Sequence, residues 1–225
     1  MRPNGTQTVA VVAGGLAVSP AVAGRIGDVD YVIAADSGLH AAMRLGLTAD
    51  LVVGDLDSVD HALLDRPGLE VDRHPAAKDQ TDIVLALDRA RDLGARAVVV
   101  VSGGGGRLDH ALANLLVLAS PRYAGLQMRA LIGDAEIAVV RDHHAMTAPE
   151  GTVVSLFAVD GPALGVTTDG LRYPLHDEVL DPLSSRGVSN EFVGGPAAVR
   201  LTDGVLLVIR PGVRRDSRGG GDRTP

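Results

Sequence analysis

The first 140 residues alternate short valine-rich runs with segments of helical periodicity, and this alternation restricts the fold more than any other feature. Five runs are typical of strands, mostly rich in Val and buried on both faces: TVAVVAGG, YVIAAD, LVVGDLDS, LEVDRH and RAVVVVSGG. The segments SGLHAAMRLGL, TDIVLALDRARDLG and LDHALANLLVLAS predict helices between them. In the second of these, Ile83, Leu87 and Ala90 fall on one helical face. The pattern therefore predicts an α/β fold, a doubly wound parallel sheet with helices on both faces.

The helical period disappears after about Arg141. Short β-like runs punctuated by Gly, Pro and Asp follow, such as GTVVSLFAVDG, ALGVTTDGL and VLLVIRPG, and they predict a smaller C-terminal all-β sandwich. The stretch TDGVLLV predicts a hairpin that turns at Asp203-Gly204. We therefore expect an α/β nucleotide-binding domain over residues 1–142 and a β-sandwich domain over 143–212. The polar, glycine-rich stretch 213–225 is expected to be disordered.

Composition excludes several partners. The formal net charge of −7 disfavours nucleic acid, and two Phe, three Tyr and no Trp leave few residues for base stacking. With no Cys, disulfides and thiolate metal ligands are excluded. Neither a signal peptide nor a membrane-spanning apolar stretch is recognisable. We expect a soluble, cytoplasmic protein with no membrane or nucleic-acid partner.

The candidate site residues follow the predicted strands, where ligands bind in parallel α/β sheets. Asp55 and Asp57 come directly after a buried run, in VVGDLDSVD. If strand geometry persisted, their side chains would lie on one face, roughly 6–7 Å apart. Like charges so close favour a bound cation, and a metal that carries phosphates would supply it. The alternative is a turn in which Asp57 or Ser58 caps the following helix.

Two further aspartates begin helices. Asp36, in AADSG, either caps the next helix or faces a ligand. In KDQTD, Asp79 as N-cap with Asp82 three residues later resembles a capping arrangement. Lys78 instead adds a cation suited to phosphate, and Asp82 lies where it can reach a metal beside the strand ends.

The stretch SGGGGRLDH, residues 102–110, combines glycines that allow close approach to the backbone with Arg107, whose planar guanidinium suits phosphate, and Asp109. The sequence has no GxxxxGK[ST], no correctly placed GxGxxG, no HExxH and no GxSxG. Because Mg²⁺ takes oxygen ligands and shares them with substrate phosphates, metal-bridged phosphate binding is the simplest interpretation.

The order of AADSG, GDLDS, KDQTD, GGGGRLDHALAN and GVSNE resembles the thiamine pyrophosphokinase family over roughly residues 8 to 210. The resemblance implies transfer of pyrophosphate from ATP to the thiamine hydroxyl, which gives thiamine diphosphate and AMP. It also implies a homodimer in which the α/β domain of one chain and the β domain of the other share each thiamine site.

Carried over by position, the resemblance implies a Mg²⁺ site and two binding regions. Asp55, Asp57 and Asp82 would be the metal ligands, and together with Arg107 they would be the catalytic residues. The nucleotide and its phosphates would be held by Asp36, Lys78, Thr81, Arg107 and Asp109. Ser189 and Asn190 would line the thiamine side.

Departures from the family pattern leave the proposed metal ligands in place. Ser37 stands where a second glycine is common, Ala49 where proline often precedes the turn, and Leu56 where Phe is usual. With no Trp to pack on thiamine, either Phe192 or no aromatic side chain would take that place. Two alternatives stay open: a pyrophosphokinase for another hydroxymethyl heterocycle such as a pterin, and a non-catalytic nucleotide-binding regulatory protein.

Overall fold

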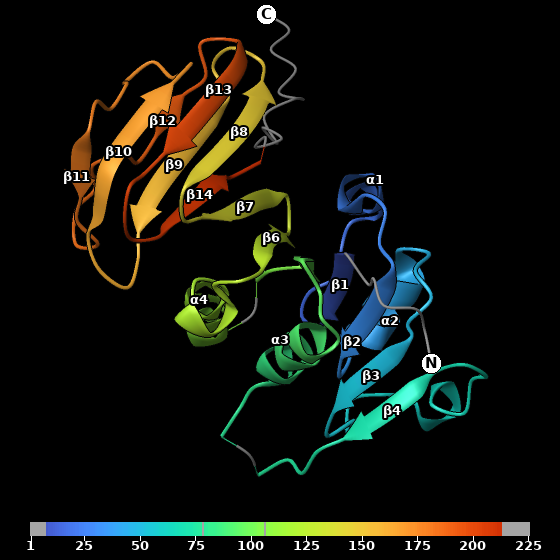
Figure 1. Cartoon of the computed structure of the whole chain (residues 1–225). Coiled ribbons are helices and arrows are strands. Elements are labelled where there is room, and N and C mark those ends of the chain that lie inside the picture. The colour runs from blue at the N-terminus through green and yellow to red at the C-terminus, as the bar shows by residue number, and fades with distance from the viewer. Residues whose placement is uncertain (1–7, 78, 106, 213–225) are drawn as a thin grey trace, which may run out of the picture.

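A computed structural model describes residues 8–77, 79–105 and 107–212. Six parallel strands form its first part in the order β6-β5-β1-β2-β3-β4. The strands are β1 (Thr8–Ala13), β2 (Tyr31–Ala35), β3 (Leu51–Gly54), β4 (Glu70–Arg73), β5 (Ala97–Ser102) and β6 (Gln127–Ile132). The α-helices are α1 (Ala23–Ile26), α2 (Gly38–Arg44), α3 (Asp82–Asp92) and α4 (Leu108–Leu118), with 3-10 turns η1 (Pro20–Val22), η2 (His61–Leu63) and η3 (Pro121–Tyr123). Figure 1 shows these elements in blue and green.

The two faces of the parallel sheet bury alternate residues of its inner strands, whereas β4 at the edge is largely exposed and is not buried on both faces as its run LEVDRH predicts. In β1, Val9 and Val11 pack into the cluster that contains α3, whereas Ala10 and Val12 pack against α1 and α2. All four side chains are fully buried, which explains the continuous apolar run in the sequence. The predicted doubly wound sheet with helices on both faces is confirmed.

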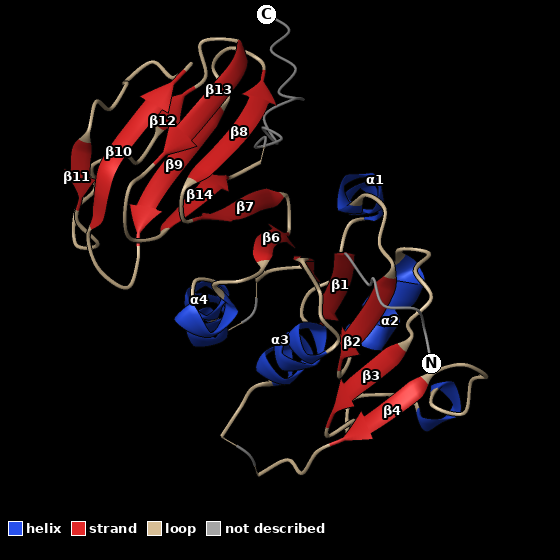
Figure 2. Cartoon of the chain, in the orientation of Figure 1, coloured by secondary structure: helices blue, strands red, loops and turns tan. Residues whose placement is uncertain are grey.

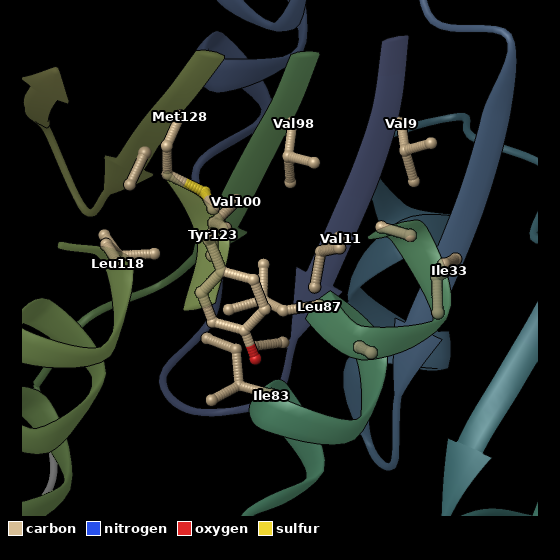
Figure 3. Packing of buried hydrophobic residues seen from close by; sticks show 14 of the residues in the cluster. Val9, Val11, Ile33, Ile83, Leu87, Val98, Val100, Leu118, Tyr123 and Met128 are labelled. Carbon is tan, nitrogen blue, oxygen red and sulfur yellow. The ribbon is translucent and has the colours of Figure 1, made fainter. Parts of the chain in front are cut away.

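Helix α3 presents the face that its periodicity predicts. Ile83, Leu87 and Ala90 are buried in the sheet core, and Figure 3 shows Ile83 and Leu87 beside Val11 and Tyr123. The helix ends at Asp92, and Gly94, just after the C-cap residue Leu93, has a φ of 77° that suits a residue without a Cβ atom. Burial of this face anchors α3 with Asp82 at its first position.

The parallel sheet continues into the second part of the molecule rather than ending at β6. The added strands are antiparallel, and the full order is β12-β9-β14-β7-β6-β5-β1-β2-β3-β4. Their bounds are β7 (Ala135–Val140), β9 (Val153–Ala158), β12 (Asn190–Glu191) and β14 (Leu206–Arg210). A second sheet, β11-β10-β13-β8, contains β8 (His143–Ala148), β10 (Ala163–Asp169), β11 (Glu178–Leu180) and β13 (Gly195–Arg200).

The two sheets form the predicted β-sandwich. Leu156 and Val208 from the long sheet share a buried core with Val166 and Val199 from the four-stranded sheet. Among the described residues no helix follows Tyr123, and Figure 2 shows the sandwich as strands and loops. Within the part of the chain that the structure describes, no helix has the length and apolar character needed to cross a membrane.

The hairpin prediction at Asp203-Gly204 is wrong. Strand β13 pairs with β8 and β10, whereas β14 pairs with β7 and β9 in the other sheet. Gly204 has a φ of 92°, as a tight turn requires, but the turn carries the chain from one sheet to the other. The predicted disordered stretch 213–225 lies outside the described residues.

Candidate active site

A cavity of about 570 Å³ opens at the carboxyl edge of the parallel strands. Its walls come from the loops after β1, β2, β3 and β5, from the start of α3 and from one side of α4. Of the sequence-predicted site residues, it brings together Asp36, Asp55, Thr81, Asp82 and Arg107. The volume lies in the range of ligand and cofactor sites.

Three carboxylates meet at this edge. One oxygen from each of Asp36, Asp55 and Asp57 lies within 4.8 Å of the others. The strand geometry does not persist, because β3 ends at Gly54 and Leu56 has a φ of 62° with its side chain fully buried. The Asp57 amide donates to Asp55 Oδ1 at 3.3 Å, so a turn brings the two aspartates together. We call Asp36, Asp55 and Asp57 the acidic cluster.

Gly54 brings Asp82 to the same place. A Cβ atom at this position would lie 3.0 Å from Asp82 Oδ1 and 3.2 Å from Asp36 Cβ, and the glycine φ is 149°. Only glycine therefore lets the two side chains close over the end of β3. Asp82 lies beside the acidic cluster but is not one of its three members. The expected metal ligands were Asp55, Asp57 and Asp82, whereas the close group consists of Asp36, Asp55 and Asp57.

The capping alternatives for the aspartates are wrong. Asp60, rather than Asp57 or Ser58, caps the turn η2 by accepting from the Ala62 amide at 3.0 Å. Thr81, rather than Asp79, occupies the N-cap position of α3.

Asp36 does not cap a helix either. Its φ is 47°, and Ser37 occupies the N-cap position of α2. Within the described residues, Asp36 Oδ1 is buried without a hydrogen-bond partner. A buried carboxylate oxygen with two further carboxylates beside it fits a hard cation that prefers oxygen ligands.

Glycine residues allow the loops around this edge to pack backbone against backbone. A Cβ atom at Gly14 would lie 2.1 Å from Ser37 Oγ, and one at Gly103 would lie 1.8 Å from the Leu16 carbonyl oxygen. Ser102 Oγ donates to the Gly14 carbonyl oxygen at 3.2 Å and ties the two loops together. The close packing holds the loops in place beside the acidic cluster.

Arg107 and Asp109 form a two-point ion pair at the start of α4. Arg107 Nη2 and Asp109 Oδ2 are 2.6 Å apart, and both side chains are exposed. The hydrogen bond from Arg107 lowers the pKa of Asp109 to about 2, and the same bond raises the pKa of Arg107. Arg107 lines the cavity, so phosphate binding there would compete with Asp109 for its donors. Lys78 lies outside the described residues.

The predicted acceptor residues lie at another cavity, of about 290 Å³, in the sandwich. Asn190 is 3% exposed, and its amide bonds both the backbone N–H and the carbonyl of Tyr173, at 3.0 and 2.7 Å. The Ser189 amide donates to Ser155 Oγ. Within one chain, no described residue lines both cavities.

The Phe192 candidate is wrong, because this side chain is fully buried in the sandwich core. Tyr173 is instead 61% exposed and lines the smaller cavity beside Asn190. Sequence reasoning missed Tyr173. The signal that could have indicated an exposed ring is the position of Tyr173 next to a proline, in RYPL. This stretch lies shortly after a glycine, where no buried strand is expected.

A parallel α/β sheet with an acidic cluster and glycine-rich loops at its carboxyl edge fits a class, the enzymes that transfer phosphate groups. Two family models divide the chain accordingly. Residues 25–130 match the catalytic domain of thiamin pyrophosphokinase, and residues 135–206 match its vitamin B1 binding domain. Together the two models span most of the sequence, so the chain belongs to the thiamin pyrophosphokinase family.

Individual relatives agree with the family models. The chain is 26% identical over 220 residues to the thiamine pyrophosphokinase of Bacillus subtilis, covering 91% of this chain and 98% of the relative. The crystal structure of a thiamin pyrophosphokinase family protein from Enterococcus faecalis is 26% identical with a TM-score of 0.74, covering 92% of this chain and all of that one. The Candida albicans thiamin pyrophosphokinase, 13% identical, has a TM-score of 0.70 over 90% of this chain and 89% of its own, and shows the shared fold. The pterin and regulatory alternatives find no support in these matches.

Proposed function

We propose that this chain transfers the pyrophosphoryl group of ATP to the hydroxyl of thiamine, giving thiamine diphosphate and AMP. The observation that carries the proposal is the acidic cluster, which includes the buried Asp36 oxygen, in a chain of this family. In the reaction, the hydroxyl oxygen bonds to the β-phosphorus of ATP and the bond from that phosphorus to the α–β bridging oxygen breaks. AMP leaves with that oxygen, and the hydroxyl proton passes to a carboxylate of the site.

The proposal includes a divalent metal, Mg²⁺, held by Asp55, Asp57 and Asp82 with Asp36 against it. Support comes from the closeness of the Asp36, Asp55 and Asp57 carboxylates and from the position of Asp82 and Asp36 beside Gly54. Bound Mg²⁺ would neutralise phosphate charge and orient the phosphate oxygens. Arg107, once released from Asp109, would add donors to the same phosphates, and Thr81 lines the wall beside them.

Residues 143–212 would supply the acceptor side through Ser189, Asn190 and the exposed Tyr173 ring. Because Asn190 already bonds the backbone of Tyr173, its role would be to hold this loop. The ring and the Ser189 hydroxyl would then contact thiamine. We also propose a cytoplasmic location, and the net charge of −7 disfavours a nucleic-acid partner.

The two-cavity arrangement leads us to propose a homodimer with shared sites. The acidic cluster and the sandwich cavity are separate within one chain, so a second copy would bring them together. Leu108, Leu112 and Leu116 are exposed at four-residue spacing along α4. This leucine stripe supplies an apolar surface that such a partner would cover.

The test is an assay of purified protein with ATP, Mg²⁺ and thiamine, in which the nucleotide product is identified. We expect AMP and thiamine diphosphate in equal amounts, with AMP formation dependent on thiamine. Release of ADP with thiamine monophosphate would place the attack at the γ-phosphorus and reject the pyrophosphokinase reaction.

A further inference from the structure

The turn between β6 and β7 contacts the glycine-rich loop that follows β5. The Gly133 amide, in the turn, donates to the Ser102 carbonyl oxygen at 2.9 Å. A Cβ atom at Gly104 would lie 3.1 Å from Ile132 Cγ2, so the loop and the end of β6 are closely packed. Ile132 and Ala135, on either side of the turn, line the larger cavity together with the loop. The position of the glycine-rich loop therefore depends on the position of this turn.

Four charged side chains hold the turn in place. Arg129, Glu136 and Arg210 come from the adjacent strands β6, β7 and β14, and the register sets Arg210 directly opposite Glu136. Arg210 Nη2 donates to Glu136 Oε2 at 2.6 Å, and Arg25 Nη2, from α1, donates to the same oxygen at 3.2 Å. Arg25 Nη1 also donates to the carbonyl oxygen of Asp134, in the turn, at 3.0 Å. Arg129 Nη1 donates to the Arg25 carbonyl oxygen at 2.9 Å, which ties α1 to the sheet. We call Arg25, Arg129, Glu136 and Arg210 the arginine cluster.

Glu136 balances three guanidinium groups with one carboxylate. Burial raises the pKa of Glu136, but the charges and hydrogen bonds of Arg210 and Arg25 outweigh burial, and the pKa lies below its ordinary value of 4.5. The carboxylate is therefore ionised at neutral pH. Without its charge, three partly buried guanidinium groups would repel one another, and Arg25 would lose the partner that orients it toward the turn.

We propose that Glu136 and Arg25 are positioning residues, which fix the β6–β7 turn and, through the contact of Gly133 with Ser102, hold the glycine-rich loop in the conformation that binds the nucleotide. Neither Glu136 nor Arg25 lines the larger cavity, so their effect on a ligand passes through the backbone of the turn. A binding loop needs such support from residues behind it, because a small displacement of the loop is enough to weaken binding. The inference deepens the proposed function and rests on it in taking ATP as the ligand of this cavity.

Two variants test the proposal against a matched control. Glu136→Gln removes the charge at the centre of the cluster, and Arg25→Gln removes the link to Asp134 while leaving the Arg210–Glu136 pair in place. The milder Arg25→Gln keeps the test valid if Glu136→Gln does not fold. Arg122→Gln is the control, because it breaks a comparable ion pair, with Asp88, whose residues do not line the cavity.

Hydrogen exchange and calorimetry are the measurements. Exchange of the Gly133 amide, followed by NMR, reports the contact with Ser102, and the amide of Val99, at the centre of β5 between β1 and β6, reports global unfolding. ATP binding is measured by calorimetry with Mg²⁺ and without thiamine.

In Glu136→Gln and Arg25→Gln, we expect Gly133 exchange to rise about three- to tenfold relative to Val99, and ATP affinity to fall by about the same factor, the scale on which residues that touch no ligand modulate a site. Arg122→Gln should change neither quantity. Equal acceleration at Gly133 and Val99 would mean a general loss of stability and would overturn the proposal. Unchanged Gly133 exchange, unchanged ATP affinity, or the same changes in Arg122→Gln would overturn it as well. Because neither measurement needs turnover, a protein that responds as expected but forms no AMP would contradict the proposed function alone.

Discussion

The acidic cluster and the sandwich cavity use their polar residues in opposite ways. At the acidic cluster, Asp36 keeps a buried oxygen without a hydrogen-bond partner among the described residues. At the sandwich cavity, Asn190 is buried as well, but its amide is occupied by the backbone of Tyr173. A buried polar group that its own chain satisfies serves the fold, whereas one that its own chain leaves unsatisfied is suited to a ligand. The comparison supports our proposal that Asp36 and its neighbours contact a ligand in one region, and Tyr173 and Ser189 in the other.

The largest expected effect is that of Asp57→Asn. The change keeps the volume of the side chain but removes the charge that a hard cation requires. We expect turnover to fall by about 10²- to 10³-fold, the scale of losing one group that stabilises transition-state charge. The rate of AMP formation at saturating ATP and thiamine measures it.

Asp60→Asn is the matched control for that variant. Asp60 lies three residues later and caps η2, and Asn caps nearly as well as Asp. We expect this variant to keep its activity and its unfolding temperature. Equal activity in both variants would mean that Asp57 has no more than a structural role.

The next effect concerns the exposed ring of Tyr173. Tyr173→Ala should lower kcat/KM for thiamine about tenfold through loss of aromatic contact, and leave the KM for ATP unchanged. Tyr173→Phe keeps the ring and should retain most of the activity. If Tyr173→Ala raised the KM for ATP instead, the sandwich cavity would not be the acceptor site.

Subunit mixing shows whether the two regions meet between chains. An Asp57→Asn chain and a Tyr173→Ala chain are combined under conditions that allow exchange, and assayed at low thiamine. In a shared-site dimer, one site of each heterodimer carries both changes and the other neither, so activity should recover to about half per heterodimer. If activity fails to recover after exchange is demonstrated, each site lies within one chain.

The parallel part of the fold could be predicted because its signals are local. Continuous apolar runs mark strands buried on both faces, and the period of residues 82–92 marks the buried side of α3. The rule that ligands bind at the carboxyl ends of parallel strands then placed Asp36, Asp55 and Asp82 at one edge, where the structure has them. Their roles as ligands remain predictions.

Features that depend on non-local pairing could not be predicted. The turn chemistry of Asp203-Gly204 is local, but the sheet that β14 joins depends on the distant strands β7 and β9. The prediction that Phe192 contacts a ligand failed for the same reason. Its burial depends on the packing of the two sheets, which the local sequence does not reveal. Residue type also did not reveal that the Asn190 amide bonds Tyr173.

A smaller effect, on stability, separates Asn190 from Asp36, whose Oδ1 atom is buried although the residue is only partly so. Asn190→Ala removes both hydrogen bonds to the Tyr173 backbone and should lower the free energy of unfolding by about 1–3 kcal/mol. Urea unfolding should show a lower midpoint with an unchanged slope. Asp36→Asn, in contrast, removes charge at a site that lacks a partner and should not destabilise the protein. A loss of stability in Asp36→Asn equal to that in Asn190→Ala would remove the distinction between the two regions.

The smallest expected effect is the titration of Asp109, which differs from the acidic cluster because its partner is an exposed arginine side chain. The hydrogen bond from Arg107 holds the pKa of Asp109 at about 2, below the ordinary 3.8. A lowered pKa in the folded state means that the pair contributes fully above pH 3.8 and is lost as the pH falls toward 2. The contribution to stability should be close to zero, since both side chains are exposed and screened by salt. In Arg107→Gln, NMR titration of the Asp109 carboxyl should give a pKa that has risen toward 3.8, and high salt should cause part of the same rise in the unaltered protein. If the pKa stayed near 2 in Arg107→Gln, the His110 amide, which also donates to Asp109, would be the main cause of the shift.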